Sequence, residues 1–136
     1  MGKASREKGK RGEREVANIF KSYGYDAARG VQYHGGPDSP DVTGLPDIHV
    51  EVKRVEALNL YDALKQSKDD SDIFEYPVVI HRRSRKEWVV IQPLKDWMEL
   101  YEGAEELYRQ SSEKDEQGLR GFLQGLLEKL RRSRLV

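Results

Sequence analysis

The clearest hydrophobic pattern in the chain is an alternation over residues 48–53, Ile-His-Val-Glu-Val-Lys. Alternation of this kind is typical of a β-strand with one buried face, because successive strand side chains point to opposite sides. Val50 and Val52 would face the core, and Glu51 and Lys53 would share the other face, about 6–7 Å apart. The pattern therefore predicts a rigid strand that presents a carboxylate and an amine side by side.

The rest of the chain alternates between helical and strand patterns. Apolar residues at helical spacing predict helices at four places: residues 11–23, 58–69, a segment opened by Pro93, and an amphipathic segment at about 113–133. The short apolar runs 77–80 and 88–91 predict a second hairpin with a basic turn, Arg82 to Lys86. We expect the polar first dozen residues to be mobile until docked and residues 30–40 to form a loop.

A turn at residues 44–47 would fold Asp41 back toward the strand 48–53. If the turn centres near Leu45-Pro46, Asp41 falls opposite Val50 or Glu51, where facing Cβ atoms lie about 4.5–5.5 Å apart. Asp47 has the strand parity of Glu51 but would be roughly 13 Å away and in the turn. We therefore expect Asp41, rather than Asp47, to be the acidic partner of Glu51.

Composition narrows the class of protein. With 136 residues, 37% of them hydrophobic, the chain is most simply one domain. It has no cysteine, which excludes disulfides and thiolate zinc sites and fits the reducing interior of a cell. It has no apolar run long enough for a transmembrane helix and no signal-peptide core, so we expect no membrane association.

The charges are balanced in number but segregated along the chain. Lys plus Arg and Asp plus Glu each total 24, yet basic residues gather at positions 3–14, 81–86 and 131–134. Segregated positive charge suggests a face for a polyanion such as DNA. The alternative is that these runs are only solvated surface.

The acidic residues supply the candidate chemistry. Asp41 and Glu51 are hard oxygen donors suited to Mg²⁺ or Mn²⁺, and Lys53 would be a fixed cation beside a phosphate or an attacking water. Glu13 lies near the buried face of the first helix, although a favourable interaction with the helix dipole would also explain it. The plain alternative for Glu51 and Lys53 is an ordinary pair of charges on a surface strand.

The histidines give a weaker indication. His34, His49 and His81 are too dispersed in the sequence to suggest a zinc site. His49 shares the strand parity of Glu51, which would place it at the edge of the candidate site. His34 falls in the predicted Gly-rich loop, where an ordinary loop residue is the simpler interpretation.

Taken in order, these elements resemble the PD-(D/E)XK nuclease superfamily, whose core is a mixed sheet flanked by helices. The opening Lys8-Gly-Lys-Arg-Gly-Glu13-Arg-Glu, Arg29 before a Gly-rich loop, Pro40-Asp41 and Glu51-Val-Lys53 are similar to those of archaeal-type Holliday junction resolvases and related phage endonucleases. The similarity covers roughly residues 6–92. It implies an α/β fold with a restriction-endonuclease-like core over residues 1–105. It does not account for residues 106–136, which we expect from their apolar stripe to be a C-terminal amphipathic helical extension packed on the core or at a dimer interface.

The resemblance also implies roles for individual residues. Catalysis would involve Glu13, Asp41, Glu51 and Lys53, and Mg²⁺ or Mn²⁺ would be held by Asp41, Glu51, Glu13 and the carbonyl of Val52. DNA-binding candidates are Lys8, Lys10, Arg11, Arg29, Arg54, Arg82 and Arg83. Gln66, on the following helix, is a weaker candidate for orienting the site.

The expected function is hydrolysis of phosphodiester bonds in branched DNA during recombination, by a homodimer that makes two symmetric cuts in the cytoplasm, or in the host cytoplasm if a phage encodes the chain. One alternative is a nicking or end-processing nuclease that acts on linear DNA. Another is a DNA-binding protein on a nuclease fold without turnover; the presence of all four acid and lysine positions argues against it.

Overall fold

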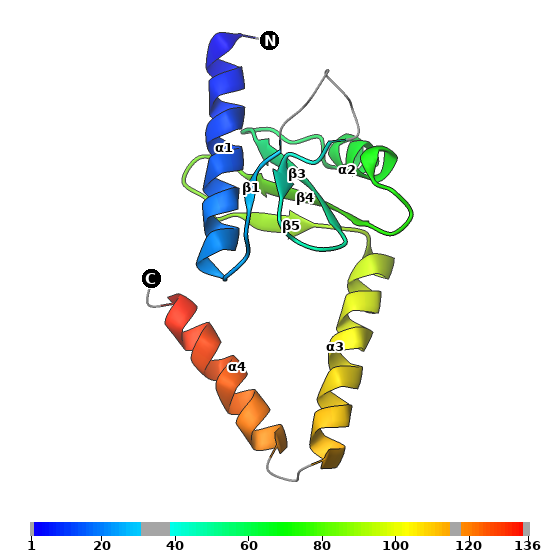
Figure 1. Cartoon of the computed structure of the whole chain (residues 1–136). Helices are drawn as coiled ribbons and strands as arrows, with labels where there is room; N and C mark the ends of the chain where they lie inside the picture. The colour runs from blue at the N-terminus through cyan, green and yellow to red at the C-terminus, as the bar shows by residue number, and fades with distance from the viewer. Residues whose placement is uncertain (1, 31–38, 115–117, 135–136) are drawn as a thin grey trace. The chain divides into compact units, whose positions relative to one another are not determined.

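The computed structural model describes residues 2–30, 39–114 and 118–134, which form an α/β fold on a five-stranded mixed sheet (Figure 1). The strands follow one another across the sheet in chain order: β1 (Ala28–Arg29), β2 (Val42–Thr43), β3 (Ile48–Arg54), β4 (Tyr76–Arg82) and β5 (Val89–Ile91). The described helices are α1 (Lys3–Ser22), α2 (Leu60–Asp70), α3 (Leu94–Lys114) and α4 (Gly118–Arg134). The predicted α/β class is confirmed. The predicted loop 30–40 lies largely outside the described residues, as does His34.

Both predicted hairpins are present. β2 pairs antiparallel with β3 and β4 with β5, whereas β3 and β4 run parallel and are joined through α2, as a parallel pair requires. Val42 faces Val50 across the first hairpin, and the Asp41 N–H donates to the Val50 carbonyl at 2.8 Å. Asp41 therefore stands beside Glu51, as the turn geometry predicted.

The turn of the first hairpin depends on a glycine. Gly44 has φ of 110°, in the left-handed region that favours glycine. A Cβ at this position would lie 2.5 Å from the carbonyl oxygen of Asp26. Close passage of the chain over the segment before β1 thus fixes where the β2–β3 turn begins.

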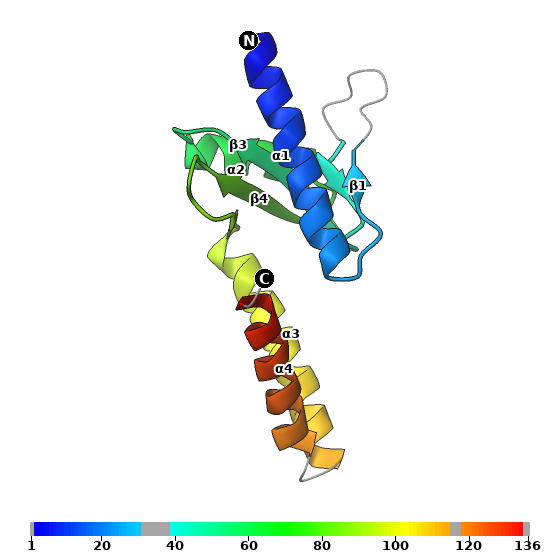
Figure 2. The same ribbon diagram turned by 90° about the vertical axis from the view of Figure 1, so that its left-hand side faces the viewer.

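The sheet is covered by α1 on one face and by α2 on the other (Figures 1 and 2). On the α1 face, Val16 and Ala17 pack against strand side chains that point to the same side of the sheet. These strand side chains are Val42, Val50, Val52, Val78 and Ile80. On the other face, the buried Ser67 of α2 donates from its hydroxyl to the Val78 carbonyl at 3.2 Å. The alternation of β3 therefore separates an apolar face under α1 from a polar face under α2.

The N-terminal segment differs from its prediction. Helix α1 begins at Lys3 and not near residue 11, so residues 3–12 are helical. Gly12 is buried there, and a Cβ at this position would lie 2.8 Å from the Arg54 Cβ, so α1 approaches β3 closely. The close contact between α1 and β3 anchors the polar first half of the helix. This half has too few apolar residues to show the helical spacing that would have predicted it.

The C-terminal residues 93–136 form a second unit, separate from residues 1–92. Because α3 is continuous from Leu94 to Lys114, the division falls before that helix and not near residue 105, where the sequence placed it. α3 and α4 meet through an edge-to-face contact of Tyr108 and Phe122, with ring centroids 5.4 Å apart. The described apolar stripe of α4 is about half-exposed: Phe122, Leu123, Leu126, Leu127 and Leu130. Within the described ranges, no helix has the length and apolar character needed to cross a bilayer.

Candidate active site

Glu13, Asp41, Glu51 and Lys53 line one cavity of about 420 Å³. They reach it from α1, from the residue before β2, and from β3. Val52 and Gln66 line the same cavity, which we call the Glu51 cavity. The structure thus brings together residues that lie between positions 13 and 66 of the sequence.

Asp41 and Glu51 are held by the backbone of the first hairpin. The Val52 N–H donates to Asp41 Oδ2 at 2.8 Å, and the Gly30 N–H donates to the Asp41 carbonyl, also at 2.8 Å. In a strand the N–H and C=O of one residue point to the same side, so the Val52 carbonyl also lies on the Asp41 side of β3. Glu51 itself is only 3% exposed, which is unusual for a carboxylate.

Burial, together with the neighbouring acids, changes the ionisation of Asp41. Burial, followed by the negative charge of Glu51, raises the pKa of Asp41 from its ordinary 3.8 to about 7, and Glu13 adds a smaller contribution. The hydrogen bond from Val52 opposes this change but does not cancel it. The cavity therefore concentrates negative charge that a proton or a divalent cation would relieve.

Lys53 is oriented by α2. Its Nζ donates to Gln66 Oε1 at 2.9 Å. The neighbouring Ser67 fixes α2 on β4, so the position of Gln66 over the sheet is determined by packing and not by the lysine alone. Gln66 thus touches the lysine of the constellation, which is the position expected of an orienting residue.

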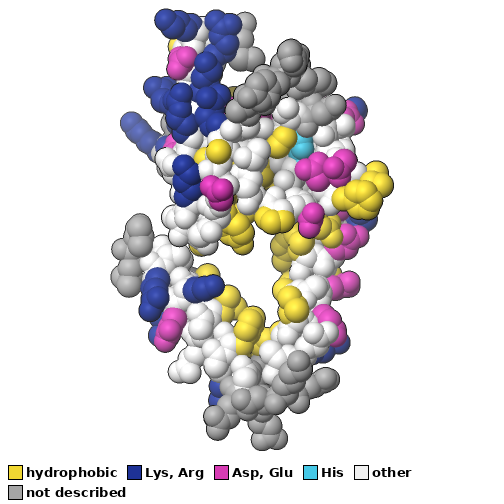
Figure 3. Space-filling model, viewed as in Figure 1, with side chains coloured by type: hydrophobic (Ala, Val, Ile, Leu, Met, Phe, Trp, Pro, Cys, Tyr) yellow, Lys and Arg dark blue, Asp and Glu magenta, His cyan; other side chains and the backbone are white. Residues whose placement is uncertain are grey.

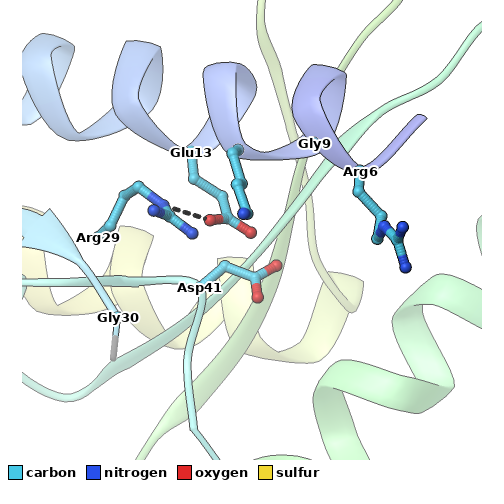
Figure 4. Close-up of a pocket in the computed structure, with 7 residues that line it drawn as sticks. Arg6, Gly9, Glu13, Arg29, Gly30 and Asp41 are labelled. Carbon is cyan, nitrogen blue, oxygen red and sulfur yellow. Dashed lines mark hydrogen bonds and ion pairs between the residues drawn. The ribbon is translucent and has the colours of Figure 1, made fainter. Parts of the chain in front are cut away.

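Glu13 makes an ion pair that the sequence did not predict. Arg29 Nε donates to Glu13 Oε2 at 2.7 Å (Figure 4). Both residues line a second cavity of about 420 Å³ that also includes Lys10 and Asp41. In Figure 4, Glu13 and Asp41 point toward each other from above and below this cavity, with Arg29 beside them. Arg29 therefore offsets part of the negative charge around Asp41.

The predicted cationic residues surround the acids in two groups. Lys and Arg side chains gather over the N-terminal part of α1 (Figure 3), where Lys8, Lys10 and Arg11 belong to the helix. A smaller cavity of about 200 Å³ is lined by Lys8, Arg11, Arg54 and Arg82, with Gly12 and Glu15. Arg83 is exposed in the β4–β5 turn.

Some of these cations are fixed by internal partners. Arg82 Nη1 donates to Glu15 Oε1 at 2.5 Å, and its guanidinium lies 5.8 Å from the centroid of the Trp88 ring. Glu56 accepts from Lys8 Nζ at 3.2 Å, from Arg54 Nη1 at 3.4 Å and from Ser84. The Ser84 and Lys8 hydrogen bonds lower the pKa of Glu56 to about 2. Glu56 therefore ties α1 and the basic β4–β5 turn to the end of β3.

The sequence missed several residues of the Glu51 cavity, among them Arg6, Gly9 and Glu56. Arg6, Gly9 and Glu13 follow helical spacing, so extending the first helix toward the N-terminus would have put them on one face. Glu56 gave no comparable signal, because its partners Lys8 and Ser84 are distant in the sequence.

Comparison of the chain with protein-family models, curated proteins and solved structures finds no match.

Proposed function

We propose that this chain is a metal-dependent DNA endonuclease with a restriction-endonuclease-like core, similar to the archaeal-type Holliday junction resolvases. The observation that carries the proposal is the convergence of Glu13, Asp41, Glu51 and Lys53 on one cavity. Three carboxylates and one amine meet there from three parts of the fold: α1, the residue before β2, and β3. They are the groups that metal-assisted phosphodiester hydrolysis needs.

The acidic donors fit Mg²⁺ or Mn²⁺. These ions prefer oxygen ligands, and Mg²⁺ is commonly held by one or two carboxylates while it keeps several waters. Asp41 and Glu51 would hold the ion, with the Val52 carbonyl on the same side of the strand. The raised pKa of Asp41 supports this fit, because a divalent cation would replace the proton that the buried acid otherwise retains. When bound, the ion supplies charge stabilisation at the phosphoryl oxygens and acidifies water.

The other residues of the site orient the reactants. Lys53, directed by Gln66, places a positive charge where negative charge develops on the phosphate. Glu13, restrained by Arg29, supplies a third carboxylate from α1 that can hold water at the acid cluster. This assignment gives each of the four residues a distinct position around the cavity.

The surrounding cations favour a nucleic acid as substrate. Lys8 and Arg54 line both the Glu51 cavity and the smaller basic cavity, so positive charge continues away from the acids. Contacts of this kind bind backbone phosphates and give no sequence specificity directly. We therefore assign Lys8, Lys10, Arg11, Arg54, Arg82 and Arg83 to DNA binding, and Arg29 to both Glu13 and the DNA backbone.

We further propose that the substrate is branched DNA, that the enzyme is a homodimer, and that it acts in recombination in the cytoplasm, or in a host cytoplasm if a phage encodes it. Two symmetric cuts in a four-way junction need two active sites. With Mg²⁺ present, the chain should cleave a synthetic four-way junction faster than a linear duplex of the same sequence. A gel-based cleavage assay with both substrates, and with EDTA as the metal-free control, measures this.

Each outcome of that assay has a defined meaning. Equal cleavage of junction and duplex would replace the resolvase assignment with a nicking or end-processing nuclease. Binding of both DNA forms without cleavage at any Mg²⁺ or Mn²⁺ concentration would make the chain a DNA-binding protein on a nuclease fold.

A further inference from the structure

His49 is a buried polar residue to which the proposed reaction assigns no role. It lies on β3 two residues before Glu51 and is 0% exposed. The alternation of the strand puts both side chains on the α2 face, and His49 Nε2 lies 3.1 Å from Glu51 Oε1. A buried imidazole in this position needs an explanation, because desolvation of a polar side chain costs free energy unless a partner is present.

The direction of this hydrogen bond follows from its partners. An ionised carboxylate only accepts hydrogen bonds, so the Nε2–H of His49 donates to Glu51 Oε1. One oxygen of Glu51 is thereby engaged on the α2 side, while the Glu51 side chain also lines the cavity that contains Asp41. The imidazole therefore restrains the rotation of the Glu51 carboxylate.

The opposite edge of the ring faces a different acid. His49 Nδ1 lies 3.8 Å from Glu75 Oε1, beyond hydrogen-bond distance, and is a buried atom without a hydrogen-bond partner among the described residues. Glu75 Oε1 accepts from the Asp72 N–H at 3.0 Å, which fixes it in the loop before β4. The short contact of His49 is thus to Glu51, and the longer one is to a carboxylate that is already bound.

Three acidic residues, Glu51, Glu75 and Asp70, surround the His49 ring. Ligand atoms of His49, Glu51 and Asp70 also lie within 4.8 Å of one another. The same group could therefore hold a cation of its own, an alternative that the test must distinguish.

We propose that His49 is a positioning residue for Glu51: its Nε2–H fixes one carboxylate oxygen so that the side chain is held ready to bind the metal ion with Asp41. This inference rests on the proposed metal site. Residues that orient metal ligands typically contribute 10–100-fold to metal affinity or activity. His49 would act through Glu51 without touching the metal ion or the substrate.

Two conservative variants separate positioning from a purely structural role. In His49→Gln the amide can take the place of Nε2–H and reach Glu51, whereas in His49→Asn the shorter amide corresponds to Nδ1 and faces Glu75. Both keep a polar group in the same buried position, so a structural role predicts similar behaviour. We expect His49→Asn to weaken Mn²⁺ binding about 10–100-fold and His49→Gln to stay close to wild type.

Isothermal titration calorimetry with Mn²⁺, without DNA, measures the affinity independently of cleavage, and thermal unfolding of each metal-free variant checks its fold. Equal Mn²⁺ affinity of His49→Asn and wild type would overturn the positioning role and leave the nuclease proposal intact. Loss of a binding event in both variants would make His49 a ligand and also overturn it. Absence of Mn²⁺ binding to the wild type would contradict the metal site and with it the proposed function.

Discussion

Asp41→Asn should reduce metal-dependent DNA cleavage by more than about 100-fold while leaving DNA affinity nearly unchanged. Asp41 lies beside Glu51 in the cavity and would be a direct metal ligand. Its substitution should therefore lower the cleavage rate by more than the roughly 10–100-fold that is typical for residues that only orient ligands. DNA affinity depends mainly on the surrounding Lys and Arg residues, which this substitution leaves in place. Cleavage rates under single-turnover conditions and a fluorescence-anisotropy titration with DNA measure the two quantities.

Asp47→Asn is the matched control for this substitution. Asp47 also follows a proline, but it is exposed in the β2–β3 turn, and its carbonyl accepts from the Tyr76 N–H. Its side chain is not part of the Glu51 cavity. Cleavage by Asp47→Asn should therefore equal that of the wild type. An inactive Asp47→Asn together with an active Asp41→Asn would contradict the assignment of the metal ligand.

Asp41→Asn should also stabilise the metal-free protein at neutral and alkaline pH. The folded chain keeps the Asp41 proton up to about pH 7, whereas an unfolded chain releases it near pH 4. Between these values the folded state binds more protons, so this group's contribution to the free energy of unfolding falls as the pH rises. At pH 8, above both pKa values, the linkage is at its full size, and we expect Asp41→Asn to raise the free energy of unfolding by up to about 4 kcal/mol.

Urea unfolding of wild type and Asp41→Asn in EDTA, from pH 4 to pH 8, measures this difference. It should be smallest at pH 4 and reach its largest value above pH 7. Added Mg²⁺ should then raise the stability of the wild type at pH 8 but not that of the variant, because a ligand that binds only the folded state stabilises it. A difference that is constant over the whole pH range would contradict the raised pKa.

Much of the first hairpin could be predicted from the sequence because a strand has a period of two. The alternation of residues 48–53 and the turn after Thr43 left two registers, with Asp41 opposite Val50 or Glu51. The structure has the one that pairs Val42 with Val50 and keeps both valines in the core. That register put Asp41 beside Glu51. The crossover helix α2 and the second hairpin followed from equally regular patterns.

Other features could not be predicted because they depend on distant residues. The first half of α1 has few apolar residues, and its close approach to β3 at Gly12 is visible only in three dimensions. The parity of β3 placed His49 on the face of Glu51 but gave no sign that α2 and the loop before β4 would bury it beside Glu75. The ion pair of Arg29 with Glu13 likewise depends on how α1 crosses β1.

The central claim, that Asp41 and Glu51 form the metal site of this protein, is tested most directly by anomalous diffraction from crystals soaked in Mn²⁺. We predict an Mn²⁺ peak with carboxylate oxygens of Asp41 and Glu51 about 2 Å away. A peak held by His49, Glu51 and Asp70 without Asp41, or no peak in the Glu51 cavity at millimolar Mn²⁺, would contradict the account.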